Sequence, residues 1–276
     1  MKELESGSFS TRPFPLEWPE TIRVTTWNIN RGLQLDGIIE FLADSRADLI
    51  LLQEADISAA RTGRRNIPQE IAQALRMNYI FGREFKELAQ GSPISPAYHG
   101  QTTLSRLPLS NARILRFREQ SAFWRPRWFI PPLPCLQRRL GGRMALICEI
   151  AVNGKALLIL NVHLESRGRN ELRIRQFSEI LAEIGRCPAE MPVLMAGDFN
   201  FDLSRGPAIS LMAGMGIHNS FASLDGRGTI LKSRNGKPRA IDWMLTRGAL
   251  AVCNLAIHES ITASDHFPLS SELRLK

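Results

Sequence analysis

Short apolar runs, each followed closely by polar residues, recur along almost the whole chain. The runs are rich in β-branched residues and too short for helices, so they predict buried strands. The predicted strands are residues 22–27, 48–53, 79–81, 102–104, 145–152, 156–163, 192–196, 241–246 and 269–275. This succession constrains the fold more than any other feature, because nearly all-apolar strands require sheets that are covered on both faces.

Helical periodicity separates several of these runs. Apolar residues at intervals of three and four predict helices over residues 35–45, 68–77, 171–184 and 207–215. Asn66 stands just before the second helix and can cap its free N–H groups. Asn153-Gly154 separates two predicted strands and predicts a tight hairpin. Strands with helices between them indicate a mixed α/β protein.

Length and composition favour one domain. The chain has 276 residues, of which 44% are hydrophobic and 22% charged, and this composition excludes wholesale disorder. No internal repeat or linker divides the sequence. We therefore expect an extended lead-in over residues 1–20 and a single domain over residues 21–276, with an irregular excursion at 113–143.

The excursion at 113–143 is basic and aromatic. It contains eight arginines and one acidic residue, Glu119. Its prolines predict irregular structure. Its interleaved aromatic residues are Phe117, Phe123, Trp124, Trp128 and Phe129. Three interpretations stay open: a surface loop packed on its own aromatics, a phosphate-gripping loop with stacking faces, or a membrane contact. The net charge of +8 favours an anionic partner such as nucleic acid, an acidic membrane surface or a phosphorylated small molecule.

Cysteine usage and the first residues bear on the compartment. The cysteines at positions 135, 148, 187 and 253 are scattered and lack metal-binding spacing, which favours free thiols in a reducing compartment. The first 20 residues contain no apolar segment of the signal-peptide kind, and the longest apolar runs are strand-sized. We therefore expect a cytoplasmic protein.

The polar residues that follow the apolar runs form an ordered series. A single residue of this kind is usually a turn former or a helix cap, but a series at strand ends predicts a site at the edge of a sheet. The series comprises Asn28, Glu54, Asn161, His163, Asp198, Asn200, Asp242, Asp265 and His266.

These residue types suit metal-assisted hydrolysis of a phosphate ester. Hard oxygen ligands without sulfur favour Mg²⁺, with Mn²⁺ as a substitute, over zinc. Glu54 and Asp265 could hold such an ion with Asn28 nearby. The reaction also needs an oriented water and stabilisation of the charge that develops on the phosphoryl group. The candidates for these two tasks are Asp198 and His266 for the water, and Asn200 and His163 for the charge.

Several of these residues stand in motifs that resemble the endonuclease/exonuclease/phosphatase superfamily. The matching segments are Thr26-Trp27-Asn28, Leu52-Gln53-Glu54, Asn161-Val162-His163-Leu164, Gly197-Asp198-Phe199-Asn200, Ile241-Asp242-Trp243 and Ser264-Asp265-His266. They extend over nearly the whole chain. The resemblance implies a four-layer α/β/β/α sandwich, in which two packed mixed sheets are flanked by helices and the motif loops meet at one edge.

The same resemblance implies a role for each matching residue. Glu54 would bind Mg²⁺, helped by Asn28 and Asp265. Asp198 would position or deprotonate the attacking water, and Asn200 would hold the phosphate.

The resemblance also assigns the two histidines. Asp242 would orient and polarise His266, and His163 would donate to a non-bridging phosphate oxygen. The stretch 163–166, His-Leu-Glu-Ser, resembles that of the 5′-tyrosyl-DNA phosphodiesterases, whereas a tyrosine is common in this region of the abasic-site endonucleases.

The motifs do not show which group is attached to the phosphate. One interpretation is a nuclease or DNA-end-processing phosphodiesterase, with nucleic acid and preferably DNA as the partner of a monomeric enzyme. The alternative is a phospholipid or inositol-phosphate hydrolase whose residues 124, 128, 129 and 130 enter a membrane surface. A catalytically dead binding module is disfavoured, because every expected acidic residue and histidine is present.

Overall fold

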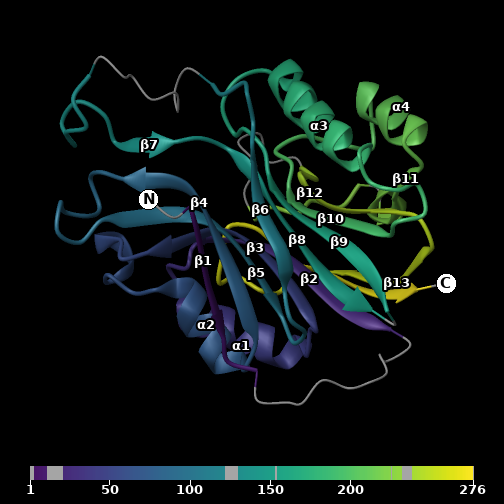
Figure 1. The fold of residues 1–276 in the computed structure, drawn as a ribbon, viewed down its shortest axis with the longest axis horizontal. Helices are drawn as coiled ribbons and strands as arrows, with labels where there is room; N and C mark the ends of the chain where they lie inside the picture. Colours follow the sequence, from purple (N-terminus) through teal and green to yellow (C-terminus); the bar gives the residue numbers. More distant parts are fainter. Residues whose placement is uncertain are drawn as a thin grey trace.

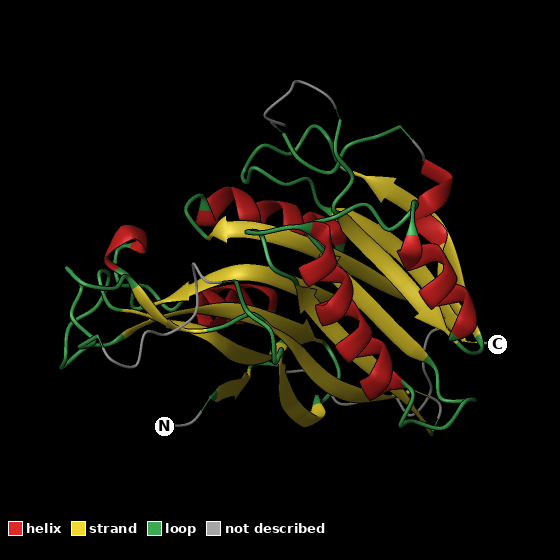
Figure 2. Cartoon of the chain, turned by 90° about the horizontal axis from the view of Figure 1, so that it is seen from above, coloured by secondary structure: helices red, strands yellow, loops and turns green. Residues whose placement is uncertain are grey.

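Two β-sheets packed face to face, with helices on both outer faces, make up the computed structural model (Figure 1). The structure describes residues 3–10, 21–121, 130–152, 154–224, 226–231 and 238–275. Seen from above, the helices lie outside the two layers of strands (Figure 2). The predicted α/β sandwich is confirmed.

The first sheet has the strand order β1-β4-β5-β3-β2-β14-β13, and β7 pairs with β4 beside this path. Its strands are β1 (Leu4–Ser8), β2 (Ile22–Arg31), β3 (Leu49–Ile57), β4 (Asn78–Glu87), β5 (Ala97–Ser105), β7 (Arg139–Gly141), β13 (Leu250–Ile257) and β14 (Leu269–Leu275). The pair β2/β3 is parallel, with Asn28 opposite Gln53. The residues that end these two strands therefore lie at the same edge of the sheet.

The second sheet has the order β11-β12-β10-β9-β8-β6. Its strands are β6 (Ser110–Arg116), β8 (Met144–Val152), β9 (Lys155–His163), β10 (Val193–Asp198), β11 (Ile217–Asn219) and β12 (Asp242–Arg247). Here β9 and β10 are the parallel pair, and Asp198 lies directly opposite His163. Each sheet thus contributes one parallel pair whose carboxyl ends carry candidate site residues.

The helices cover the sheets through their apolar faces. They are α1 (Leu35–Ser45), α2 (Ile67–Leu75), α3 (Asn170–Ile184) and α4 (Pro207–Gly214), with short 3₁₀ turns at Ala60–Thr62 and Ser220–Leu224. The predicted cap is confirmed, because the Asn66 side chain accepts a hydrogen bond from the Gln69 N–H (3.2 Å). In the described structure no helix is both long enough and apolar enough to cross a membrane.

Two apolar cores hold the layers together. The larger core lies between the sheets and under α3 and α4, and includes Leu51, Leu146 and Phe177. The smaller core packs α1 and α2 on the outer face of the first sheet around Trp27. Leu51, Leu146 and Phe177 are fully buried, so truncating such a side chain costs about 2–5 kcal/mol of stability.

The sequence did not predict five short or peripheral strands: β1, β6, β7, β11 and β13. β1, in the expected lead-in, pairs with β4 as an edge strand. β6 begins before residue 113 and ends at Arg116, and β7 also lies in the expected excursion. The expectation of irregular structure throughout 113–143 is therefore wrong, because backbone pairing with β8 and β4 orders its two ends.

Half of the arginines in this segment are paired with acidic residues. Four of its arginines form ion pairs with acidic residues elsewhere in the chain: Arg113 with Glu183, Arg116 with Glu3, Arg139 with Glu87 and Arg143 with Glu84. A count of charges within 113–143 misses these partners, because they are distant in sequence. Phe123, Trp124, Trp128 and Phe129, on which the stacking and membrane interpretations depend, lie outside the described residues.

Candidate active site

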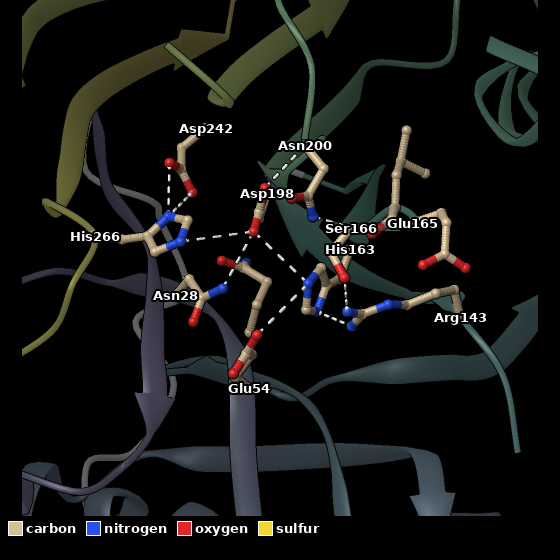
Figure 3. Close-up of polar contacts among 12 residues, drawn as sticks. Asn28, Glu54, Arg143, His163, Glu165, Ser166, Asp198, Asn200, Asp242 and His266 are labelled. Atoms are coloured by element: carbon tan, nitrogen blue, oxygen red, sulfur yellow. Dashed lines mark hydrogen bonds and ion pairs between the residues drawn. The ribbon is translucent and has the colours of Figure 1, made fainter. Parts of the chain in front are cut away.

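The candidate site lies where the ends of the two parallel strand pairs meet (Figure 3). The first sheet supplies Asn28 and Glu54, and the second supplies His163, Asp198 and Asp242. A hydrogen bond from the Ser264 Oγ to the Asn28 carbonyl (2.6 Å) ties the loop before β14 to this edge. The predicted residues therefore meet although they are far apart in sequence.

Glu54 projects from an irregularity in β3. The pairing register of β3 shifts between Leu52 and Ala55, and Glu54 has a left-handed backbone with φ of 55°. Bulges of this kind redirect a side chain and are common at active sites. Burial favours the neutral acid, but the basic side chains around it, His99, His163, Arg31 and Arg143, outweigh burial and hold the pKa of the Glu54 carboxyl well below its usual range. Glu54 is therefore an anion at neutral pH.

Asp198 occupies the centre of the site. Its Oδ2 accepts a hydrogen bond from the Asn28 Nδ2 (3.2 Å), and its Oδ1 accepts from the Asn200 backbone N–H (2.8 Å). The Nε2 atoms of two histidines face the same Oδ2, His163 at 3.6 Å and His266 at 3.8 Å. Asp198 is 2% exposed, so this carboxylate is held in a single orientation by neighbours from both sheets.

The second histidine forms a dyad with Asp242. The His266 Nδ1 lies 2.9 Å from the Asp242 Oδ2, and the same oxygen accepts a hydrogen bond from the Thr229 hydroxyl (2.6 Å). Burial alone would lower the pKa of His266, but the charge and hydrogen bond of Asp242, with Asp198 and Asp265 nearby, raise it to about 10. The ring therefore carries both protons at neutral pH.

His163 has different neighbours. Its Nδ1 lies 2.8 Å from the Arg143 Nη1 and 3.3 Å from the Glu84 Oε1. Arg143 also donates to the Glu84 Oε2 (2.9 Å) and to the Ser166 Oγ (3.1 Å). No sequence motif pointed to Glu84, and Arg143 was predicted only as part of the basic excursion.

Two predicted residues contribute in other ways. The Asn200 side chain donates to the Leu164 carbonyl (3.1 Å), so its amide lies at the end of β9 beside His163. Asp265 is exposed, and its Oδ1 is 3.3 Å from the Ser264 Oγ. Among the described residues the Asp265 carboxylate makes no hydrogen bond to Asn28, and Asp265 is the exposed member of the predicted set.

Asn161, another polar residue of β9, is part of the scaffold. Its Oδ1 accepts from the Gln53 Nε2 (2.8 Å), and its Nδ2 donates to the carbonyls of Leu52 (3.0 Å) and Thr102 (2.9 Å). These buried bonds join the two sheets immediately behind the site.

The described residues offer two possible sets of metal ligands. Ligand atoms of Asp198, Asp242 and His266 lie within 4.8 Å of one another. In this set the His266 Nδ1 is already engaged by the Asp242 Oδ2 at 2.9 Å, and the same oxygen accepts from the Thr229 hydroxyl. Glu54 is ionised and has only oxygen ligands to offer, so its donor chemistry fits Mg²⁺ or Mn²⁺ better.

Solved structures share this architecture. An endonuclease/exonuclease/phosphatase from Beutenbergia cavernae is similar with a TM-score of 0.65 and 17% identity, over 92% of this chain and 72% of that one. A humanized TDP2 from D. rerio is similar with a TM-score of 0.62 and 18% identity, over 93% of this chain and 100% of that one. TDP2 from C. elegans is similar with a TM-score of 0.60 and 18% identity, over 92% of this chain and 75% of that one. No curated protein sequence matches significantly.

The sandwich and the residues gathered at its edge define a phosphoesterase, an enzyme that hydrolyses phosphate esters. The sequence model of the Endonuclease/Exonuclease/phosphatase family matches residues 25–266. The chain belongs to this family, and the resemblance inferred from its motifs is confirmed.

Proposed function

We propose that the protein is a Mg²⁺-dependent phosphodiester hydrolase that acts on nucleic acid, preferably DNA. The observation that carries the proposal is the setting of Asp198. This carboxylate is oriented by Asn28 and Asn200 and lies between the Nε2 atoms of two histidines. One fixed carboxylate with hydrogen-bond donors on both sides suits a water nucleophile beside a phosphoryl group.

The proposed ion ligands are Glu54, Asn28 and Asp265. Glu54 is ionised at neutral pH and supplies the charge that Mg²⁺ prefers. When bound, a divalent cation polarises a phosphoryl oxygen and offsets its developing charge. Asn28 has a second task, because its Nδ2 also holds Asp198, and its Oδ1 accepts the Asn30 backbone N–H (3.1 Å).

Asp198 is the proposed group that positions or deprotonates the attacking water. Its Oδ1 accepts from the Asn200 N–H, and its Oδ2, which also accepts from the Asn28 Nδ2, faces the two histidines; the water would meet this second oxygen. Attack forms a bond from the water oxygen to phosphorus and breaks the bond to the leaving oxygen. The proton of the water passes to Asp198.

The donors around Asp198 stabilise the charge that develops on the phosphoryl group. His163 and Asn200 would hold non-bridging oxygens. His266, protonated through its dyad with Asp242, supplies a further charged donor. Removing one donor of this kind typically lowers kcat by about 10²–10³-fold.

Basic residues beside Asn200 support a polyanionic substrate. A cavity of about 310 Å³ is lined there by Asn200 and by Arg173, Arg205 and Arg239. Arg173 is buried against the carbonyls of residues 165 and 166, Arg205 pairs with Asp202, and Arg239 is exposed. A phosphate next to the cleaved one would meet the arginine side of this cavity. The likeness of the 163–166 stretch to 5′-tyrosyl-DNA phosphodiesterases favours DNA ends.

One observation favours the second candidate, hydrolysis of a phospholipid or inositol phosphate. Leu133 and Leu136 are each 50% exposed, and Ile94 in the β4–β5 connection is 97% exposed. The two segments are joined where the Leu88 N–H donates to the Arg138 carbonyl (2.8 Å). Exposed apolar side chains beside arginines are typical of surfaces that enter a membrane interface.

The experiment is hydrolysis of a 5′-phosphotyrosyl oligonucleotide by the full chain with EDTA, Mg²⁺ or Mn²⁺. We expect no turnover in EDTA and recovery with either ion. Full activity in EDTA would reject the metal mechanism. Binding of the uncleaved oligonucleotide should weaken steeply with salt, because each neutralised phosphate releases counterions. Binding that does not change with salt would contradict the nucleic-acid assignment.

A further inference from the structure

The bond between Arg143 and His163 determines which ring nitrogen carries hydrogen. The Arg143 Nη1 lies 2.8 Å from the His163 Nδ1. A guanidinium has only donors and loses no proton at ordinary pH. The Nδ1 must therefore accept this bond, and the hydrogen of a neutral ring must be on the Nε2.

The Glu84 carboxylate would favour the opposite tautomer. Its Oε1 lies 3.3 Å from the same Nδ1, and a carboxylate oxygen can only accept a hydrogen bond. A count of donors decides between the two. The two hydrogens of the Arg143 Nη1 serve the Glu84 Oε2 (2.9 Å) and the His163 Nδ1. Glu84 needs no hydrogen from the ring, because its Oε1 accepts from the Gln101 Nε2 (2.9 Å).

The orientation of Gln101 is itself fixed. Its Nε2 also donates to the Met144 carbonyl (2.8 Å), so the amide nitrogen, and not the oxygen, must face Glu84. Glu84 is 1% exposed and Arg143 is 2% exposed, so neither side chain can move away without leaving a buried charge unpaired.

The other end of the ring points into the site. The His163 Nε2 is buried and has no hydrogen-bond partner among the described residues. It lies 3.6 Å from the Asp198 Oδ2 and 3.9 Å from the Glu54 Oε1. An unpaired buried donor is costly unless a ligand completes it. A phosphoryl oxygen between the two carboxylates would accept its hydrogen.

We propose that Arg143 is a positioning residue that holds His163 as a neutral ring with hydrogen on the Nε2, so that His163 donates to a phosphate oxygen and exchanges no proton in the reaction. This inference rests on the proposed function for the identity of the acceptor, but the tautomer can be measured without any substrate.

The direct experiment is a ¹⁵N spectrum of the metal-free full chain, labelled at histidine, at neutral pH. Comparison with His163→Asn assigns the ring signals. We expect the Nδ1 to appear as an unprotonated acceptor and the Nε2 to carry hydrogen. Hydrogen on the Nδ1, alone or on both nitrogens, would overturn the proposal. This readout is independent of catalysis, so it separates the tautomer from the proposed reaction.

A mutant cycle tests the route through His163, with the 5′-phosphotyrosyl oligonucleotide as substrate. Arg143→Lys keeps the charge opposite Glu84 but loses the planar fork that reaches three partners. We expect kcat to fall at least ~10-fold with KM changed less than ~3-fold, because the loss affects a transition-state interaction. In a His163→Gln background the same change should lower kcat less than ~3-fold. Additive losses, or a rise in KM alone, would show that Arg143 acts on the substrate itself.

The matched control is Arg247→Lys. Arg247 is also buried, but it donates to the carbonyls of Ile184 (3.1 Å) and Pro188 (2.8 Å), away from the candidate site. This variant should keep the His163 spectrum and kcat of wild type. If Arg143→Lys fails to fold, the wild-type spectrum still decides the tautomer.

Discussion

Two histidines face one carboxylate oxygen from opposite sides, and their far nitrogens have opposite partners. The Nδ1 of His266 meets the Asp242 carboxylate at 2.9 Å, whereas the Nδ1 of His163 meets the Arg143 guanidinium at 2.8 Å. Asp242 raises the pKa of His266 to about 10. Arg143 has only hydrogen-bond donors, so it can only donate to the His163 Nδ1. The first ring is therefore a charged donor, while we infer that the second is a neutral one.

This difference shows how one site obtains two kinds of donor from the same residue type. The Nε2 atoms that face the proposed substrate are alike, and the charge of each ring is set by the residue that contacts its Nδ1. Substitutions at the His266 side and at the His163 side should therefore change activity in different ways.

The largest effect is expected at the carboxylate that both rings share. Asp198→Asn removes the group that takes the proton of the water, so kcat should fall by about 10²–10⁴-fold. The shape is almost unchanged, and the circular dichroism spectrum and thermal midpoint should stay close to wild type. A folded variant with near-normal turnover would remove Asp198 from the mechanism.

On the His266 side, Asp242→Asn should lower kcat by about 10²-fold and shift the pH profile. His266 is needed in its protonated form, so wild-type activity should persist until the pH approaches about 10. Without the carboxylate the pKa falls, and the alkaline loss of activity should begin at a lower pH. The measurement is kcat against pH for both proteins. An unmoved alkaline limb would contradict the dyad.

Glu54→Gln should weaken ion binding more than it affects either ring. We expect the Mg²⁺ concentration for half-maximal rate to rise at least ~10-fold, because an ionised ligand becomes neutral. The check is a Mg²⁺ titration of the rate. Glu171→Gln, an exposed change at the start of α3, is the control that should follow wild type.

The smallest effect concerns stability on the His163 side. Burial raises the pKa of the Glu84 carboxyl, but its basic neighbours His163 and Arg143 outweigh burial and lower the pKa from 4.5 to about 2. Its ionised form therefore adds stability that is fully present above pH 4.5 and is lost as the pH falls towards 2. Urea unfolding across this range should show a smaller loss for Glu84→Gln than for wild type. Equal losses would mean that Glu84 is not the group responsible.

The sequence predicted the residues that face the substrate better than those behind them. Asp198 and His266 stand in short motifs at strand ends, and such ends meet at one edge of a sheet. Glu84 and Arg143 had no comparable signal, because a carboxylate inside β4 and an arginine in a basic segment become partners only when β4 and β8 pack, 59 residues apart in the chain.

Prediction of the strands has the same limit. Long apolar runs predicted β3, β9 and β10, whereas β6 and β7 depend on pairing with distant strands. The left-handed backbone of Glu54 could not be predicted from the sequence either, because it results from the register shift between β3 and β5.

The central claim, hydrolysis of a nucleic-acid phosphodiester at this edge, is tested most directly by a parallel Mg²⁺ assay with Asp198→Asn as the blank. The substrates are supercoiled plasmid, a 5′-phosphotyrosyl oligonucleotide, phosphoinositide vesicles and sphingomyelin vesicles. We predict turnover of one or both DNA substrates, absent from the blank and from both lipids. Turnover confined to the vesicles would contradict the nucleic-acid assignment and make the exposed Leu133 and Leu136 part of a membrane contact.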